Sequence, residues 1–205
     1  MTERSPSDPL PFRPAGALLP EAEKQRKMGV SCMNIRRAMV FDLPGVVKLY
    51  DDTHEAERRG LITTGWLPGV YPVRATAEAA LQRGDLFVME ENNQIYGSAL
   101  INQIQVDVYE GAPWEHDVPP DQVCVLHTLM ISPKRFGRGL GPQFVRFYEE
   151  YALEHEWPEL RIDTNARNER ARAMYHKLGY REIAIVPTVF NGIPNVNLVL
   201  LEKHL

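Results

Sequence analysis

The sequence has 205 residues and a formal net charge of −4, and 44% of its residues are hydrophobic and 24% charged. That length suits one large domain or two small ones, and the composition is ordinary for a globular protein. A sequence pI of about 5.9 argues against a general nucleic-acid binder, which would carry a basic excess. The two cysteines, Cys32 and Cys124, form no CxxC pair, which excludes a disulfide framework and a zinc ribbon.

No apolar run reaches the roughly 18 residues that a membrane helix needs, and the first residues lack the apolar core of a signal peptide. We therefore expect a cytoplasmic protein with no membrane partner and no nucleic-acid partner. We expect it to be a monomer or a homodimer.

Residues 1–32 differ in composition from the rest of the chain. Five of the sixteen prolines lie there, and a charged stretch at 21–27 follows them. Such a composition buries little apolar surface, so we expect an extended or disordered arm in which 21–27 has room for one short helix. The arm is either a partner-binding segment or a mis-assigned start upstream of Met33. We expect the folded domain to span 33–205.

Beyond the arm, hydrophobic periodicity and turn residues predict alternating strands and helices. In chain order, the expected elements are a strand at 34–40, helices at 42–58 and 75–83, strands at 85–90, 95–108 and 122–132, a helix at 142–155, a strand at 160–164, a helix at 168–178, and strands at 180–188 and 195–202. Long loops are expected at 60–72 and 109–121. One mixed α/β domain is the simplest interpretation.

A glycine-rich turn, SPKRFGRGLGP from Ser132 to Pro142, lies between the most apolar strand and a strongly amphipathic helix. Glycines let the backbone approach a ligand closely, and the free N–H groups at a helix N-terminus favour an anion. Lys134, Arg135 and Arg138 add positive charge. The turn therefore predicts a phosphate or pyrophosphate site, and a tight turn without a ligand is the alternative.

The spacing of the glycines argues against two common phosphate ligands. A GxxxxGK[ST] loop is excluded because no Lys-Ser or Lys-Thr follows Gly141. A dinucleotide fingerprint reads GxGxxG and opens the first βαβ unit, whereas this turn reads GxGxG and follows four expected strands. ATP and NAD are therefore poor candidates.

Two motifs resemble those of the GCN5-related N-acetyltransferase (GNAT) superfamily. The acetyl-CoA motif of that superfamily, Gln/Arg-x-x-Gly-x-Gly/Ala, is matched by FGRGLG, with Phe136 in place of the usual Gln or Arg. Its second motif, Asn-x-x-Ala-x-x-x-Tyr followed by x-x-x-Gly-aromatic, is matched by NERARAMYHKLGY from Asn168 to Tyr180. The resemblance covers about 34–205 and leaves the arm outside.

The resemblance implies an α/β fold: a mixed, mostly antiparallel central sheet that is splayed between strands four and five, with helices on both faces. It implies acetyl-CoA as the cosubstrate, its pantetheine chain lying along the backbone of Leu129, Met130 and Ile131 like an added strand. Asn168 should contact the cosubstrate at the start of the next helix. The turn residues implied to hold the pyrophosphate are Gly137, Arg138, Gly139, Leu140, Gly141 and Pro142. Arg135 and Phe136 are also implied to bind the cosubstrate.

Acetyl transfer to an amine needs a neutral amine and a proton for the leaving thiolate. The resemblance makes Tyr175 the proton donor and a contact of the cosubstrate, although spacing alone would make it a core aromatic. A carboxylate at the position of Asp163 is the base in relatives that acetylate protein N-termini; otherwise Asp163 is a structural partner of Arg161 or Arg167. His127 is either a satisfied core residue or a proton relay through water.

The aromatic residues of the two long loops are implied to bind the acceptor, namely Trp66, Tyr71, Tyr109 and Trp114; anchoring of the loops is the alternative. Cys124 is expected to be buried packing rather than a nucleophile. The histidines show no ligand spacing, so we expect no metal.

The leading hypothesis is an acetyl-CoA-dependent N-acetyltransferase that acetylates a primary amine of a small molecule by direct attack in a ternary complex. The alternatives are a protein N-terminal or lysine acetyltransferase, a catalytically silent acyl-CoA-binding module, and a purely structural domain. Only an enzyme predicts thiol release with an amine, lost in Tyr175→Phe.

Overall fold

A computed structural model describes residues 33–205, so the expected arm and its short helix lie outside the described residues. Seven strands form one sheet in the order β1-β2-β3-β4-β5-β7-β6. The strands are β1 (Asn34–Arg37), β2 (Leu86–Glu91), β3 (Gln94–Asn102), β4 (Val123–Ile131), β5 (Glu159–Asn165), β6 (Arg181–Phe190) and β7 (Ile193–His204). The helices are α2 (Leu43–Arg58), α3 (Arg74–Arg83), α4 (Leu140–Glu154) and α5 (Glu169–Lys177).

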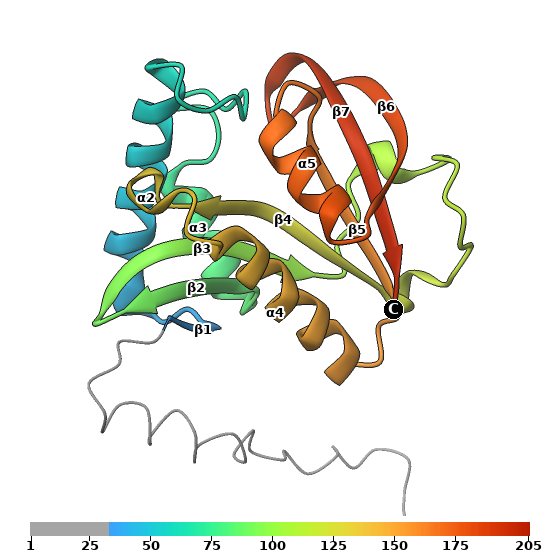
Figure 1. Ribbon diagram of the computed structural model, residues 1–205, viewed down its shortest axis with the longest axis horizontal. Helices are drawn as coiled ribbons and strands as arrows, with labels where there is room; N and C mark the ends of the chain where they lie inside the picture. Colours follow the sequence, from blue (N-terminus) through green and yellow to red (C-terminus); the bar gives the residue numbers. More distant parts are fainter. Residues whose placement is uncertain (1–32) are drawn as a thin grey trace, which may run out of the picture. The chain divides into compact units, whose positions relative to one another are not determined.

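The pairing of the strands confirms a mixed, mostly antiparallel sheet, because β4 and β5 form its one parallel pair. That pair is short: Val123–Leu126 of β4 lie opposite Glu159–Ile162 of β5. Beyond it β4 continues to Ile131 and β5 to Asn165 without pairing. The two strands therefore diverge toward their carboxyl ends, as Figure 1 shows.

Successive side chains of a strand point to opposite faces, and the buried residues of β2 follow this alternation. Leu86 and Val88 pack with the apolar residues of α2 and α3. Phe87 and Met89 pack with the apolar residues of α4 and with Tyr175 of α5. Helices α2 and α3 thus cover one face of the sheet, and α4 and α5 cover the other.

The long segment after β3 covers part of the face that α2 and α3 leave free. Tyr109 of this segment packs in a third cluster with Val123 and Val125 of β4 and with Leu198 and Leu200 of β7. A loop with a buried tyrosine and a half-buried tryptophan is therefore a third covering layer, placed over the end of the sheet where β4 and β5 pair.

Two expected strands end earlier than predicted. The strand expected at 34–40 ends at Arg37, because Asp42 accepts hydrogen bonds from the Arg36 guanidinium at 2.7 Å and the Met39 N–H at 2.8 Å and so turns the chain. The strand expected at 95–108 ends at Asn102, whose side-chain oxygen accepts the Ile104 N–H at 2.9 Å. Such local side-chain bonds compete with the ladder. In residues 33–205, no helix combines the length and apolar character that spanning a membrane requires.

Candidate active site

A cleft of about 740 Å³ lies where β4 and β5 diverge. Its wall combines the glycine-rich turn, the first turn of α4, the end of β4 and one face of α5. The structure brings together there most of the residues expected to hold a cosubstrate: Leu129, Met130, Ile131, Arg135, Phe136, Gly137, Gly139, Leu140, Gly141, Pro142, Asn168 and Tyr175.

Two glycines of the turn are favoured by their backbone conformation rather than by a lack of space for a side chain. Gly137 and Gly139 have φ angles of +77° and +74°, in the left-handed region that glycine tolerates best. A Cβ added at either residue would meet nothing within 4 Å, so neighbouring protein atoms do not require a glycine there. The backbone amides are left accessible at the N-terminus of α4, where unpaired N–H groups and the helix dipole favour an anion.

Gly141 serves a different purpose, because a Cβ at this position would lie 2.8 Å from the Met174 sulfur. The first turn of α4 therefore packs directly against α5. This contact keeps the two walls of the cleft at a fixed separation.

The cations of the turn are only partly free for a ligand. The Arg135 guanidinium lies 4.1 Å from the Tyr96 ring centroid and 3.0 Å from a Glu91 oxygen. Arg138 is exposed and is not part of the cleft wall, which differs from the expectation that it lines the site. Phe136, at the motif position that differs from the superfamily pattern, stacks under the Arg170 guanidinium at 4.0 Å.

A β-bulge interrupts β4 beside the cleft. Ser98 and Leu100 of β3 lie opposite Met130 and His127, so Thr128 and Leu129 together face Ala99. Thr128 has a φ of +53°, which is uncommon for a β-branched residue. Bulges of this kind re-aim the backbone and release it from the ladder. Here the released backbone lies between two cavities, both of which Leu129 lines.

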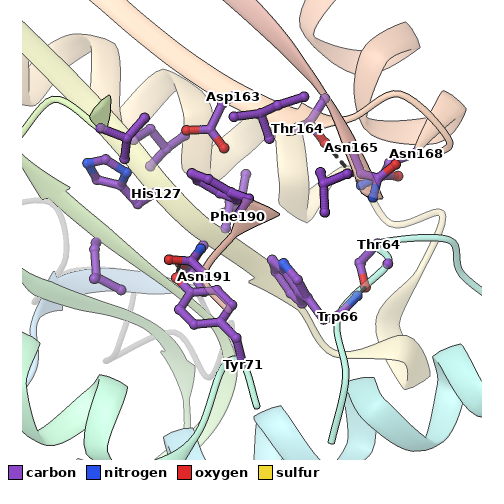
Figure 2. Close-up of a pocket in the computed structure, with 18 of the residues that line it drawn as sticks. Thr64, Trp66, Tyr71, His127, Asp163, Thr164, Asn165, Asn168, Phe190 and Asn191 are labelled. Atoms are coloured by element: carbon purple, nitrogen blue, oxygen red, sulfur yellow. Dashed lines mark hydrogen bonds between the residues drawn. The ribbon is translucent and has the colours of Figure 1, made fainter. Parts of the chain in front are cut away.

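The second cavity, of about 270 Å³, adjoins the cleft and shares Trp66, Leu129, Asn168 and Tyr175 with it. In Figure 2, Asp163 and His127 lie on one side of the view and Trp66 and Tyr71 on the other. The remaining wall mixes apolar and polar side chains. The apolar ones include Ile104, Val106, Phe190, Ile193, Val196 and Leu198, and the polar ones include Arg83, Asn102, Asn165 and Asn191.

Asp163 is the only carboxylate in the wall of the second cavity. Its Oδ2 accepts a hydrogen bond of 2.9 Å from the Tyr109 hydroxyl, which lowers its pKa, but burial outweighs this and raises the pKa of Asp163 to about 7. A carboxyl group with a pKa close to neutrality exchanges a proton readily at physiological pH. The structure shows no ion pair between Asp163 and Arg161 or Arg167, the structural alternative that the sequence left open.

His127 also faces the second cavity from β4. Burial lowers the pKa of His127 to about 4, so the ring is neutral at pH 7. Its Nε2 lies 3.2 Å from the Asn102 side-chain oxygen and 3.0 Å from the Ile104 carbonyl oxygen. Because both neighbours accept hydrogen bonds, Nε2 carries the proton and Nδ1 keeps a free lone pair.

Tyr175 lies where the two cavities meet and is 4% exposed. Burial, and to a lesser degree the charge of Asp163, raises the pKa of Tyr175 far above its ordinary value. The phenol therefore stays protonated and is available as a donor. Asn168 caps α5 by accepting the Ala171 N–H at 3.3 Å, and this cap fixes the start of the helix that carries Tyr175.

The four aromatic residues expected to bind the acceptor separate into two pairs. Trp66 and Tyr71 line the second cavity. Tyr109 and Trp114 do not, because they lie behind the wall: Tyr109 is 3% exposed and bonds Asp163, and the Trp114 ring stacks on the Arg161 guanidinium at 4.1 Å. The expectation of acceptor contacts is corrected for this second pair, which supports the carboxylate instead.

Sequence reasoning missed the contribution of the hairpin β6–β7 to the site. Its tip places Phe190, Asn191 and Ile193 in the cavity wall. The Asn191-Gly192 turn, with φ angles of +51° and +77°, is a recognisable hairpin signal, but the sequence does not show which cavity the tip reaches. Cys124 is buried as expected, and burial raises the pKa of its thiol to about 12.

A long cleft lined by the glycine-rich turn adjoins a smaller cavity with one carboxylate in its wall, an arrangement that suits a two-substrate transferase. The comparisons with known proteins agree with this class. A family model described as the acetyltransferase (GNAT) family matches residues 46–180. The uncharacterized N-acetyltransferase YhfO of Bacillus subtilis (strain 168) is 23% identical over 152 residues, which cover 73% of this chain and 91% of that protein.

Solved structures show the same fold. A GNAT-family acetyltransferase from Streptococcus agalactiae 2603 superposes with a TM-score of 0.70 at 24% identity, over 84% of this chain and 95% of its own. The Salmonella typhimurium protein yncA, whose structure includes its cofactor acetyl-CoA, superposes with a TM-score of 0.62 at 16% identity, over 85% of this chain and 94% of its own. This chain belongs to the GNAT acetyltransferase family and is an acetyl-CoA-dependent acetyltransferase.

Proposed function

We propose that this enzyme transfers the acetyl group of acetyl-CoA to a primary amine of a small molecule by direct attack within a ternary complex. The observation that carries the proposal is the junction of the two cavities at Tyr175 and Leu129. A thioester in the cleft and an amine in the smaller cavity would meet at this junction. Holding two reactants together in this way is a large part of the catalysis of such reactions.

Tyr175 at the junction and Asp163 in the adjoining cavity supply the proton transfers. The amine nitrogen forms a bond to the thioester carbonyl carbon while the carbon–sulfur bond breaks. Asp163 takes the proton that the amine gives up, and the Tyr175 hydroxyl gives a proton to the departing thiolate. A raised pKa suits both roles, because it makes Asp163 a base near neutrality and keeps Tyr175 protonated.

The backbone released at the β4 bulge would stabilise the negative charge that develops on the carbonyl oxygen. One backbone donor directed at such an oxyanion is worth roughly 100-fold or more in rate. The neutral ring of His127 would hold a bridging water or the acceptor through its free Nδ1 rather than act as a strong base.

The size of the second cavity supports a small acceptor over a protein chain. The cavity, of about 270 Å³, is lined by the tip of the β6–β7 hairpin and by Trp66 and Tyr71. The Asp163 carboxylate and the apolar part of the wall suit an amine on a partly apolar body, and the Arg83 and asparagine side chains of the wall suit polar groups on that body. A protein lysine or N-terminus would have to bring its flanking backbone past the hairpin.

The test is a panel of primary amines with saturating acetyl-CoA, read as released CoA thiol. We expect a subset of small amines to give turnover, and Tyr175→Phe to lower kcat by about 100-fold because a general acid contributes that much. Trp157→Phe is the matched control, because Trp157 lies beyond the end of α4 and lines neither cavity. Thermal stabilisation by acetyl-CoA without turnover on any amine would instead identify a silent binding module, and turnover on peptides alone would identify a protein acetyltransferase.

A further inference from the structure

A second group of buried charges lies at the opposite end of β5 from Asp163. Glu159, Arg161 and Asp163 alternate along the strand and so point to one face. Glu159 lies about 13 Å from Asp163 along the strand, since four residues separate them at about 3.3 Å each. Its cross-strand partner on β7 is His204. The group is therefore outside the two cavities of the active site.

The geometry points to a site for a divalent transition-metal ion, with Zn²⁺ as the best match, formed by His116, Glu159 and His204. One ligand atom of each residue lies within 4.8 Å of the other two. Glu159 Oε2 lies 3.1 Å from His204 Nδ1 and 3.5 Å from His116 Nδ1. Two ligands on a tetrahedral zinc ion are separated by about 3.3 Å, because each bond is about 2.0–2.1 Å long. These two distances lie on either side of that value.

The unsatisfied atoms of the cluster support the assignment. Glu159 is fully buried at 0% exposure, and its Oε1 has no hydrogen-bond partner among residues 33–205. The Nδ1 atom of His116 is also buried without a hydrogen bond in that part of the chain. Buried polar atoms without partners are costly, and a bound cation would satisfy both.

The charges around Glu159 also favour a cation. Glu202, 2% exposed, adds a second buried carboxylate beside Glu159, and Arg161 is the one buried positive charge facing the pair in residues 33–205. Arg181 is half-exposed and is paired with Glu115. The two histidine rings are stacked 4.6 Å apart, and their side chains are 43% and 45% exposed. An ion can therefore reach the ligands from solvent, and water can complete its coordination.

Two imidazoles and one carboxylate suit zinc better than magnesium or calcium, which prefer oxygen ligands alone. Binding would join three segments: the loop at His116, the start of β5 and the end of β7. The loop carries Tyr109, which bonds Asp163. The ion would thus stabilise the layer that supports the active-site carboxylate, and this inference goes beyond the proposed function because it does not depend on the acceptor.

The experiment is calorimetric titration of the full chain, freed of metal and of any affinity tag, with ZnCl₂ near pH 7.5. We expect one zinc ion per chain and a higher melting temperature with zinc. His116→Ala and His204→Ala should each weaken binding by about tenfold or more, and substitution with Co²⁺ should give the visible absorption of a protein-bound ion. Both histidines are partly exposed, so the variants are expected to fold, which acetyl-CoA protection against heat would verify.

His155→Ala is the control, because His155 is an exposed histidine at the end of α4, away from the cluster. It should leave zinc affinity unchanged. The proposal is overturned if wild-type protein takes up no stoichiometric zinc at micromolar free metal, or if uptake survives both histidine substitutions. A titration in which the heat comes only from proton exchange, with no zinc bound, would likewise overturn the proposal. None of these readouts requires turnover, so they are independent of the acetylation assay.

Discussion

The two ends of β5 present the same type of group in different surroundings. Asp163 and Glu159 point to the same face of one strand, and burial is the main cause of the raised pKa of each. Asp163 faces a cavity and has a neutral tyrosine as its hydrogen-bond partner. Glu159 faces two histidines and a second carboxylate. The partners, rather than burial, thus determine whether a buried carboxylate suits proton transfer or cation binding.

Replacing each carboxylate with the corresponding amide should give the largest difference between the two ends of β5, one variant losing activity and the other losing zinc binding. Asp163→Asn should lower kcat/KM by about 100-fold or more, because it removes the base while keeping an acceptor for Tyr109. Glu159→Gln should keep most of the activity but lose zinc binding. Steady-state kinetics and zinc titration on both variants measure this contrast. Equal loss of activity in both variants would show that the two ends are not separate.

The pH dependence of the unfolding free energy should also reflect the raised pKa of Asp163. Because burial raises this pKa from 3.8 to about 7, the folded state holds the proton more tightly than the unfolded chain does. Stability is therefore lost as pH rises from about 4 to about 7, by at most about 4 kcal/mol. Asp163→Asn should abolish this loss, so its unfolding free energy relative to the wild type should increase across that range.

Urea unfolding at a series of pH values gives these free energies. Glu159→Gln is again the comparison, since it changes a buried carboxyl group of the same strand and leaves Asp163 in place. An unchanged pH profile in Asp163→Asn would contradict the assignment of a neutral pKa to this residue.

Removing the Tyr109 hydroxyl tests how the segment that follows β3 affects the pKa of Asp163. The hydrogen bond from Tyr109 lowers the pKa of Asp163, so Tyr109→Phe should raise that pKa. The acid limb of the profile of kcat/KM against pH should move to higher pH, with about a tenfold loss of rate at the acid end if the shift is one unit. Trp66→Phe, in the cavity wall, should change KM for the amine instead. An acid limb that stays in place would show that the limb belongs to another group.

The smallest effect is expected for His204→Gln in metal-free protein. His204 is 45% exposed although its partner Glu159 is fully buried, and the glutamine side chain keeps an N–H donor for the Glu159 carboxylate. Denaturant unfolding without zinc should therefore differ little from the wild type, and acetylation should be unchanged. A large loss of stability without metal would mean that the histidine itself holds the loop.

Features built from residues that are adjacent in the sequence could be predicted best. The turn from Ser132 to Pro142 and the Asn168-to-Tyr180 motif are continuous in the chain, and residues of both line the cleft. The alternation of apolar residues likewise predicted the order of strands and helices. Local pattern is sufficient for these features because each is built within one element or one turn.

The remainder depends on contacts between distant parts of the chain. The strand expected at 95–108 ends at Asn102 because of one side-chain bond, which apolar periodicity does not reveal. Tyr109 is an aromatic residue in a long loop, which suggested a contact with the acceptor, but it lies behind Asp163. His116, Glu159 and His204 show no ligand spacing because the sheet brings them together, so the expectation of no metal stays a prediction that zinc titration tests.

The position of the hairpin tip at Asn191-Gly192 bears on how acceptor specificity changes among such enzymes. The tip lines the cavity proposed for the amine, whereas the cleft proposed for acetyl-CoA is lined by the glycine-rich turn, β4 and α5. Changes in the length or identity of this short connection can thus exchange one acceptor for another while the donor half of the enzyme is inherited intact.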